Sequence, residues 1–187
     1  MEVIMKFASE DLIAEHVGIK RALAILENML RILGTNHHVD VDDIKDIIHF
    51  FSVFADRCHH GKEENFLFPE LRDVRQGGMN PLITELLTEH GDLRTNLSAM
   101  SKSFQINTFD TRIFRQAAEA YTLTVTPHID KENTILFPYA DSHLSQEKQD
   151  ELRDKFDEFE NTVMGENTHK ELHLLLERLE AKYNAGA

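Results

Sequence analysis

Two copies of a histidine–glutamate motif are the feature of this sequence most able to support chemistry. In each copy a glutamate follows a histidine by four residues, and Leu-Phe-Pro comes four residues later, over 59–69 and 128–138. Residues four apart on a helix share a face, so each copy presents an imidazole beside a carboxylate. Such a pair can bind a metal ion, but a single pair is equally typical of an exposed helix surface.

The register of the two copies selects the candidate ligands. Aligning the two Leu-Phe-Pro endings places His128 on His59 and Glu132 on Glu63. The neighbouring His60 and Glu64 align with residues that are neither histidine nor glutamate. The repeat therefore favours His59, Glu63, His128 and Glu132 as functional residues.

A second pair of matches extends the repeat. Glu15-His16 and Glu89-His90 each lie upstream of one motif. Each half of the chain thus has a helix with Glu-His near its beginning, followed by a helix with His-x-x-x-Glu near its end. In an up-and-down bundle, the start of one helix lies level with the end of its antiparallel neighbour. We therefore expect His16 to face His59, and His90 to face His128.

Apolar periodicity and punctuation predict the helices that carry these residues. The first helix is predicted to start with Ser9 as its N-cap and to end at Gly34. The second begins at Asp40 and the third at Asn80-Pro81, where asparagine would be the N-cap. The fourth begins near Thr108 or Asp110. The fold class is therefore all-α, an up-and-down antiparallel four-helix bundle.

The remainder of the chain, 141–187, is predicted to be a C-terminal helical extension of a bundle domain at 1–140. Charged amphipathic stretches indicate helices over 146–164 and 166–183, with Gly165 between them. Their expected role is to cover apolar surface of the bundle or to form a homodimer.

The bulk composition excludes several functions. A formal charge of −13 argues against nucleic acid, whose binding depends on lysine and arginine. No apolar run approaches the length of a membrane span. The single Cys58 excludes an internal disulfide and agrees with a cytoplasmic location.

Four helices would bring four imidazoles and two carboxylates to one level of the core. Burying two unpaired carboxylates is prohibitive, whereas two cations offset the desolvation of all six groups. A dinuclear metal site is therefore the predicted arrangement, and histidines hydrogen-bonded within an ordinary core are the alternative. The predicted ligands are His16, His59, Glu63, His90, His128 and Glu132.

These segments, over 9–138, resemble the hemerythrin-like HHE cation-binding family, and the tail resembles extensions common in that family. The resemblance implies two iron ions, one held by the histidines of each half, with Glu63 and Glu132 and an oxo or hydroxo group bridging them. Oxygen-carrying members have a further histidine one turn after the third-helix ligand, where this chain has Arg94. Both irons would then keep an open position, which favours redox chemistry over oxygen storage.

Neighbouring polar residues have a structural interpretation. We expect His60 and Glu64 to be surface or supporting groups, because the adjacent position on a helix points about 100° away. By the same reasoning Glu15 and Glu89 are expected to turn away from the site as helix-surface charges. Tyr121 is expected to pack in the core with a hydrogen-bonded hydroxyl.

The leading functional prediction is a non-haem di-iron protein that binds and reduces oxygen, hydrogen peroxide or nitric oxide. Such an oxidoreductase would need an electron donor, which the sequence does not identify. The alternative is an oxygen, redox or iron sensor, or an iron-storage module, acting through a conformational or partner change. Zinc or manganese are the less favoured metals, since imidazole and carboxylate do not distinguish them from iron.

Overall fold

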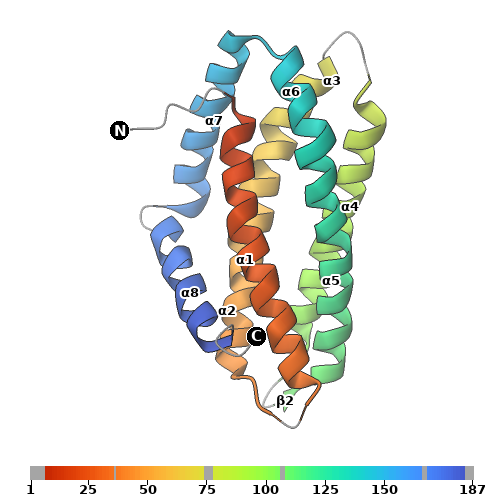
Figure 1. Ribbon diagram of the computed structural model, residues 1–187, viewed down its shortest axis with the longest axis vertical. Coiled ribbons are helices and arrows are strands. Elements are labelled where there is room, and N and C mark those ends of the chain that lie inside the picture. Colours follow the sequence, from red (N-terminus) through yellow and green to blue (C-terminus); the bar gives the residue numbers. More distant parts are fainter. Residues whose placement is uncertain (1–6, 36, 74–77, 106–107, 166–167, 184–187) are drawn as a thin grey trace.

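The computed structural model describes residues 7–35, 37–73, 78–105, 108–165 and 168–183, and these are almost entirely helical (Figure 1). The elements are α1 (Ser9–Leu33), α2 (Val41–Phe50), η1 (Phe51–His60), η2 (Glu63–Leu67), α3 (Phe68–Asp73), α4 (Asn80–Lys102), β1 (Phe104–Gln105), β2 (Thr108–Phe109), α5 (Thr111–Lys131), η3 (Glu132–Leu136), α6 (Phe137–His143), α7 (Gln146–Met164) and α8 (Thr168–Tyr183). The prediction of an all-helical protein is confirmed. The strands β1 and β2 form one short antiparallel pairing between α4 and α5.

Polar side chains start several helices. The carboxylates of Asp40 and Asp110 each accept a hydrogen bond, 3.0 Å long, from a backbone N–H in the first turn of α2 and α5. Both positions match predicted helix starts. The predicted N-caps Ser9 and Asn80 were wrong, because each is already the first helical residue. Ser9 instead donates its hydroxyl to Asp141 at 2.6 Å, which ties α1 to α6.

Both histidine–glutamate motifs lie where α-helix gives way to π-helix. Segment η1 ends with His59 and His60, and segments η2 and η3 begin at Glu63 and Glu132. A π-helix uses i→i+5 hydrogen bonds, is rare, and occurs frequently at functional sites. The histidine and glutamate of each motif still share a face, with Nε2 to carboxylate oxygen distances of 3.7 Å in the first motif and 3.0 Å in the second.

The apolar core is divided into two clusters, and the motif residues lie between them. Along α1, Leu12 belongs to one cluster and Ile19 to the other. Along α4, Leu86 and Leu93 are divided in the same way. His16 and His90 lie between these leucines and isoleucines in the chain, so a polar layer crosses the middle of an otherwise apolar interior.

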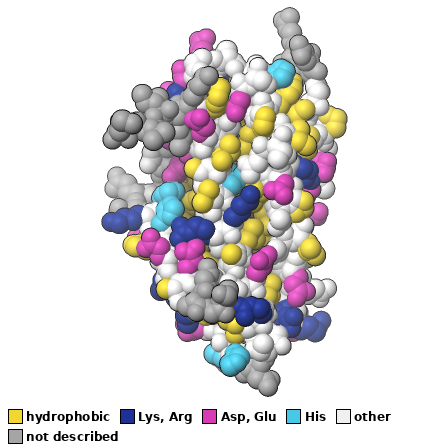
Figure 2. Space-filling model, in the orientation of Figure 1, with side chains coloured by type: hydrophobic (Ala, Val, Ile, Leu, Met, Phe, Trp, Pro, Cys, Tyr) yellow, Lys and Arg dark blue, Asp and Glu magenta, His cyan; other side chains and the backbone are white. Residues whose placement is uncertain are grey.

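Helices α7 and α8 lie one after the other along one side of the molecule, beside α1 and α2 (Figure 1). Leu152 and Phe156 of α7 join one apolar cluster, whereas Met164 at the end of α7 and the buried leucines of α8 join the other. Helix α7 ends at Gly165, which has a φ of +75° and interrupts the helix as predicted. Helix α8 begins at Thr168, and the predicted start at 166 lies outside the described residues. None of the described helices is long and apolar enough to cross a membrane. On the face drawn in Figure 2, acidic and basic side chains lie among the hydrophobic ones.

Gly61 allows α7 to approach the first motif closely. A Cβ at this position would come within 2.8 Å of ring carbons of Phe159 on α7. We expect Gly61→Ala to lower the free energy of unfolding by about 1–3 kcal/mol, because the ring or the helix must move. Gly91→Ala is the matched control: a Cβ there meets nothing within 4 Å and should stabilise α4 by about 0.5–1 kcal/mol. Urea unfolding measures both, and equal effects would contradict the tight contact.

Asp43 anchors α8 to α2 and predicts a pH dependence. Its carboxylate accepts hydrogen bonds of 2.5–2.6 Å from Arg178, Lys182 and Tyr183. Burial opposes ionisation, but these donors outweigh it and lower the pKa of Asp43 from 3.8 to about 2. The stabilisation is therefore present above pH 4 and lost as the pH falls through about 2. At pH 7, Asp43→Asn should unfold about 1–2 kcal/mol more easily, since the cationic partners are half-exposed. At pH 2, close to this pKa, that difference should shrink markedly in the same urea measurement, and an undiminished loss there would argue against the ion pairs.

Candidate metal centre

The structure brings all six predicted ligands together in the polar layer. They come from six different elements, and each side chain is at most 2% exposed to solvent. Helices α1 and α4 supply one histidine each, η1 and α5 supply the other two, and η2 and η3 supply the glutamates. The six predicted ligands are His16, His59, Glu63, His90, His128 and Glu132.

The four histidines form two pairs, as the repeat predicted. The Nε2 atoms of His16 and His59 lie 2.9 Å apart. Those of His90 and His128 lie 3.2 Å apart. Each pair therefore turns the same ring nitrogen of both residues toward one point, which is the arrangement that two imidazoles adopt around a shared ion.

The two glutamates connect the pairs. One oxygen of Glu132 lies 3.2 Å from Nε2 of His16 and the other lies 3.0 Å from Nε2 of His128. The oxygens of Glu63 lie 3.7 Å from Nε2 of His59 and 3.4 Å from Nε2 of His90. Each carboxylate thus offers one oxygen to each histidine pair.

These carboxylates fit a metal centre better than an ordinary buried ion pair. All four of their oxygens are buried, and none has a hydrogen-bond donor in acceptable geometry among the described residues. A buried carboxylate without donors is very unfavourable unless a cation compensates it. Donor atoms of His16, His59 and Glu132 lie within 4.8 Å of one another, as do those of Glu63, His90, His128 and Glu132. Imidazole and carboxylate ligands suit iron, manganese or zinc.

Glu15 and Glu89 support the ligand histidines, which corrects the prediction that they turn away. Nδ1 of His59 donates to Glu15 at 2.7 Å, and Nδ1 of His128 donates to Glu89 at 2.9 Å. Glu15 precedes His16 but bonds to His59, and Glu89 precedes His90 but bonds to His128. Each bond therefore connects two helices. Such a carboxylate fixes the ring orientation and the tautomer of a metal-binding histidine. The repeated Glu-His dipeptide was the sequence signal for this role.

The other two histidines are supported from the opposite half of the repeat. Nδ1 of His90 donates to Glu64 at 2.6 Å, and Nδ1 of His16 donates to Asn133 at 3.0 Å. Glu64 and Asn133 occupy equivalent positions in the two motifs. Glu64 was predicted to be either a surface group or a supporting group, and its hydrogen bond to His90 makes it a supporting group.

The lysine before each bridging glutamate completes the support. Lys62 donates to Asp11 and Glu15 at 2.7 Å and to Glu160 at 2.8 Å, and it is 1% exposed. Lys131 donates to Glu85 at 2.7 Å and also to Glu89. Burial raises the pKa of Glu15, and the charge of Lys62 opposes that shift. The charge of Lys62 therefore favours the carboxylate form of Glu15 beside His59.

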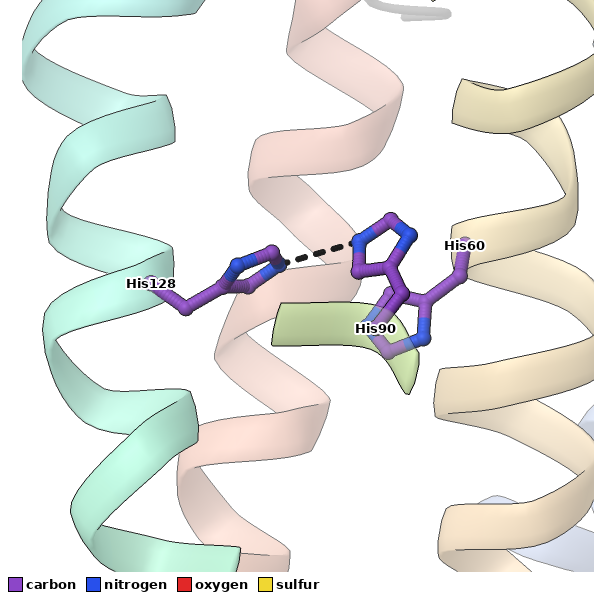
Figure 3. A group of neighbouring side chains, drawn as sticks. All are labelled: His60, His90 and His128. Atoms are coloured by element: carbon purple, nitrogen blue, oxygen red, sulfur yellow. Dashed lines mark hydrogen bonds between the residues drawn. The ribbon is translucent and has the colours of Figure 1, made fainter. Parts of the chain in front are cut away.

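His60 is buried beside the second histidine pair and is not a surface group, which corrects part of the prediction (Figure 3). Segment η1 contacts both α1 and α4, so adjacent residues can both face the interior, one toward each helix.

A nitrogen of His60 lies within 4.8 Å of those of His90 and His128. Its ring, however, stacks on that of His90 with centroids 3.9 Å apart and planes only 20° apart. A metal ion lies in the plane of its imidazole ligand, so two stacked rings do not bind the same ion. His60 therefore packs against a ligand.

Tyr121 is fully buried and packs on Phe51 with ring centroids 4.9 Å apart, as expected of a core residue. Its hydroxyl has no hydrogen-bond partner among the described residues, so the predicted hydrogen bond was wrong.

The environment shifts the histidine pKa values in opposite directions when no metal is bound. Burial lowers the pKa of His59 to about 3. Burial acts the same way on His90, but the nearby carboxylate of Glu63 and the hydrogen bond to Glu64 outweigh it and raise its pKa to about 9. Burial also opposes ionisation of Glu132, yet its proximity to His128 and His16 holds its pKa well below the usual value. The interior therefore keeps a carboxylate charged and ready to bind a cation.

A surface hollow lies beside the second histidine pair. It is lined by Glu64, Phe68, Pro69, Arg72 and Leu87. Two of these residues contact His90 directly, Glu64 through the hydrogen bond and Phe68 through a stacked ring at 5.8 Å. The second pair is thus close to solvent on this side.

Comparison with known proteins agrees with this geometry. The model of the hemerythrin HHE cation-binding domain matches residues 8–140. An uncharacterized protein of Mycobacterium bovis and one of Mycobacterium tuberculosis are each 25% identical over 163 residues. The match covers 85% of this chain but only 63% of each of those relatives. No solved structure matches. The chain belongs to the hemerythrin family of HHE cation-binding domains.

Proposed function

We propose that this chain is a non-haem di-iron protein that binds and reduces a small oxidant, namely oxygen, hydrogen peroxide or nitric oxide. The observation that carries the proposal is the placement of Glu63 and Glu132, which are fully buried and turn one oxygen toward each histidine pair. Two metal ions held about 3.5–4 Å apart would satisfy these oxygens. We also infer that the long helical segments form the up-and-down antiparallel four-helix bundle expected from the sequence.

The residues have distinct roles in this proposal. His16 and His59 would hold one iron, His90 and His128 the other, and the two glutamates would bridge them, as the sequence prediction had it. Bound iron would supply the site for the oxidant and the electrons that reduce it. The three supporting carboxylates and the amide oxygen of Asn133 hold the Nδ1 protons and so keep each Nε2 free to bind metal.

The surroundings restrict what reaches the centre. Apolar side chains such as Leu86, Leu93 and Phe137 are buried next to the polar layer and exclude bulk water. The hollow lined by Glu64 and Phe68 offers the nearest surface approach to the second pair. A small uncharged oxidant suits such an apolar surround, and a bulky substrate does not.

A sensor or iron-storage role is the second candidate. The observation that favours it is the contact between Lys62 and Glu160, because it links the support of His59 to the C-terminal helix α7. Metal binding could then be transmitted to α7. A change in oligomeric state or in amide-exchange protection of α7 on metal loading, without consumption of oxidant, would favour this role.

Replacing ligands and their neighbours tests the site. We expect His59→Ala and Glu63→Ala to remove most of the bound metal, because each eliminates a donor. His60→Ala should retain two ions per chain, since His60 stacks on a ligand. Glu64→Gln should weaken binding by about 10–100-fold, because it perturbs the support of His90. Metal analysis of the purified variants gives these values. Equal losses from His59→Ala and His60→Ala would make His60 a ligand.

The optical spectrum and rapid mixing test the chemistry. A ferric pair absorbs in the near ultraviolet, whereas zinc does not, so the spectrum identifies the metal. We expect the anaerobically reduced protein, mixed with peroxide in stopped flow, to regain this absorption while one peroxide is consumed per two irons. His59→Ala serves as the control without a complete centre. Oxygen that binds and leaves unchanged over many cycles, with peroxide untouched, would disprove the reduction.

A further inference from the structure

The two halves of the centre carry the same chain of contacts behind one histidine each. In the first half, Lys62 donates to Glu15, and Glu15 accepts from His59. In the second half, Lys131 donates to Glu89, and Glu89 accepts from His128. In each half, a lysine holds a glutamate in place, and that glutamate in turn holds one histidine of the pair predicted to bind a metal.

The surroundings of the two lysines differ. Lys62 is 1% exposed, whereas Lys131 is 22% exposed. Helix α7 causes the difference: it supplies Glu160 to the ammonium group, and the ring of Phe156 lies 5.7 Å from Lys62 Nζ. Both recorded carboxylate partners of Lys131 lie on α4, and none comes from the C-terminal extension in the described part of the chain.

The charges explain why α7 matters to Lys62. A buried ammonium group needs carboxylate partners, and removing one of them is strongly unfavourable. Asp11 and Glu15 come from α1, and Glu160 is the partner supplied by α7. Glu15 and Glu160 also lie near Cys58 in a group that could accept a cation, but the Lys62 ammonium already bonds both carboxylates.

We propose that α7 holds the metal of the His16 and His59 pair in place through Lys62, so that Lys62 and Glu160 are positioning residues for His59. The proposal rests on the proposed dinuclear centre. It makes the two metals inequivalent. The first lies behind Lys62 and Glu15, which are 1% and 5% exposed, and the second lies behind Lys131 and Glu89, which are 22% and 19% exposed, beside a surface hollow. The second metal should therefore exchange faster.

The test is the release of Fe²⁺ from the anaerobically loaded protein to a chromophoric ferrous chelator. The unaltered chain should release its two ions in two phases. Glu160→Gln should speed the slower phase by about tenfold and leave the faster one unchanged, because the loss of the charge loosens Lys62 and Glu15. Lys131→Met should speed only the faster phase. Glu160→Asp keeps the charge and should restore a slow phase.

Glu158→Gln is the matched control, because it removes the same charge from an exposed position on α7. It should change neither phase. Release in a single phase, or a Glu160→Gln variant with both rates unchanged or both raised equally, would overturn the positioning role. Thermal unfolding of each metal-free variant separates a local effect from loss of the fold, and Glu160→Asp decides the matter if Glu160→Gln does not fold. Binding of fewer than two Fe²⁺ by the unaltered chain would overturn the proposed function itself and this inference with it.

Discussion

The burial of two carboxylates without hydrogen-bond donors is the constraint on which the rest of the structure depends. Glu63 and Glu132 are fully buried, and their oxygens face imidazole nitrogens that would repel a cation if protonated and bind one if neutral. Desolvation of such groups is very unfavourable, and a pair of metal ions is the compensation that the donor set permits. The division of the apolar core, the π-helical segments at the motifs and the supporting shell all serve to hold six donors at one level.

The supporting shell is as ordered as the ligands. Each of the four histidines directs Nε2 inward and donates Nδ1 to an oxygen acceptor, from Glu15, Glu64, Glu89 or Asn133. Two of these acceptors are themselves held by buried or half-buried lysines. Behind His59 and His128, a carboxylate is thus followed by a lysine. These opposite charges stabilise the polar layer within the apolar interior.

Much of the site could be predicted from the sequence because it is repeated. The register of two motifs identified Glu63 and His59 against adjacent competitors, and apolar spacing located the helices. Three features could not be found in this way. The inward turn of Glu15 depends on contacts across helices, which spacing along one helix does not reveal. The burial of His60 depends on η1 lying between two helices, and Ser9 is the first residue of α1, with its hydroxyl in a tertiary bond to Asp141, where a capping bond was expected.

The crossed supports have a consequence for how such a chain could have arisen. Glu64 of the first motif holds a histidine of the second half, and Asn133 of the second motif holds a histidine of the first. Each bridging glutamate likewise reaches both pairs. A single helix pair of this design would lack half of every ion's environment, so it could assemble a centre only by associating with a second copy. Joining two such units in one chain lets the halves differ, and Glu64 and Asn133 do differ at equivalent positions.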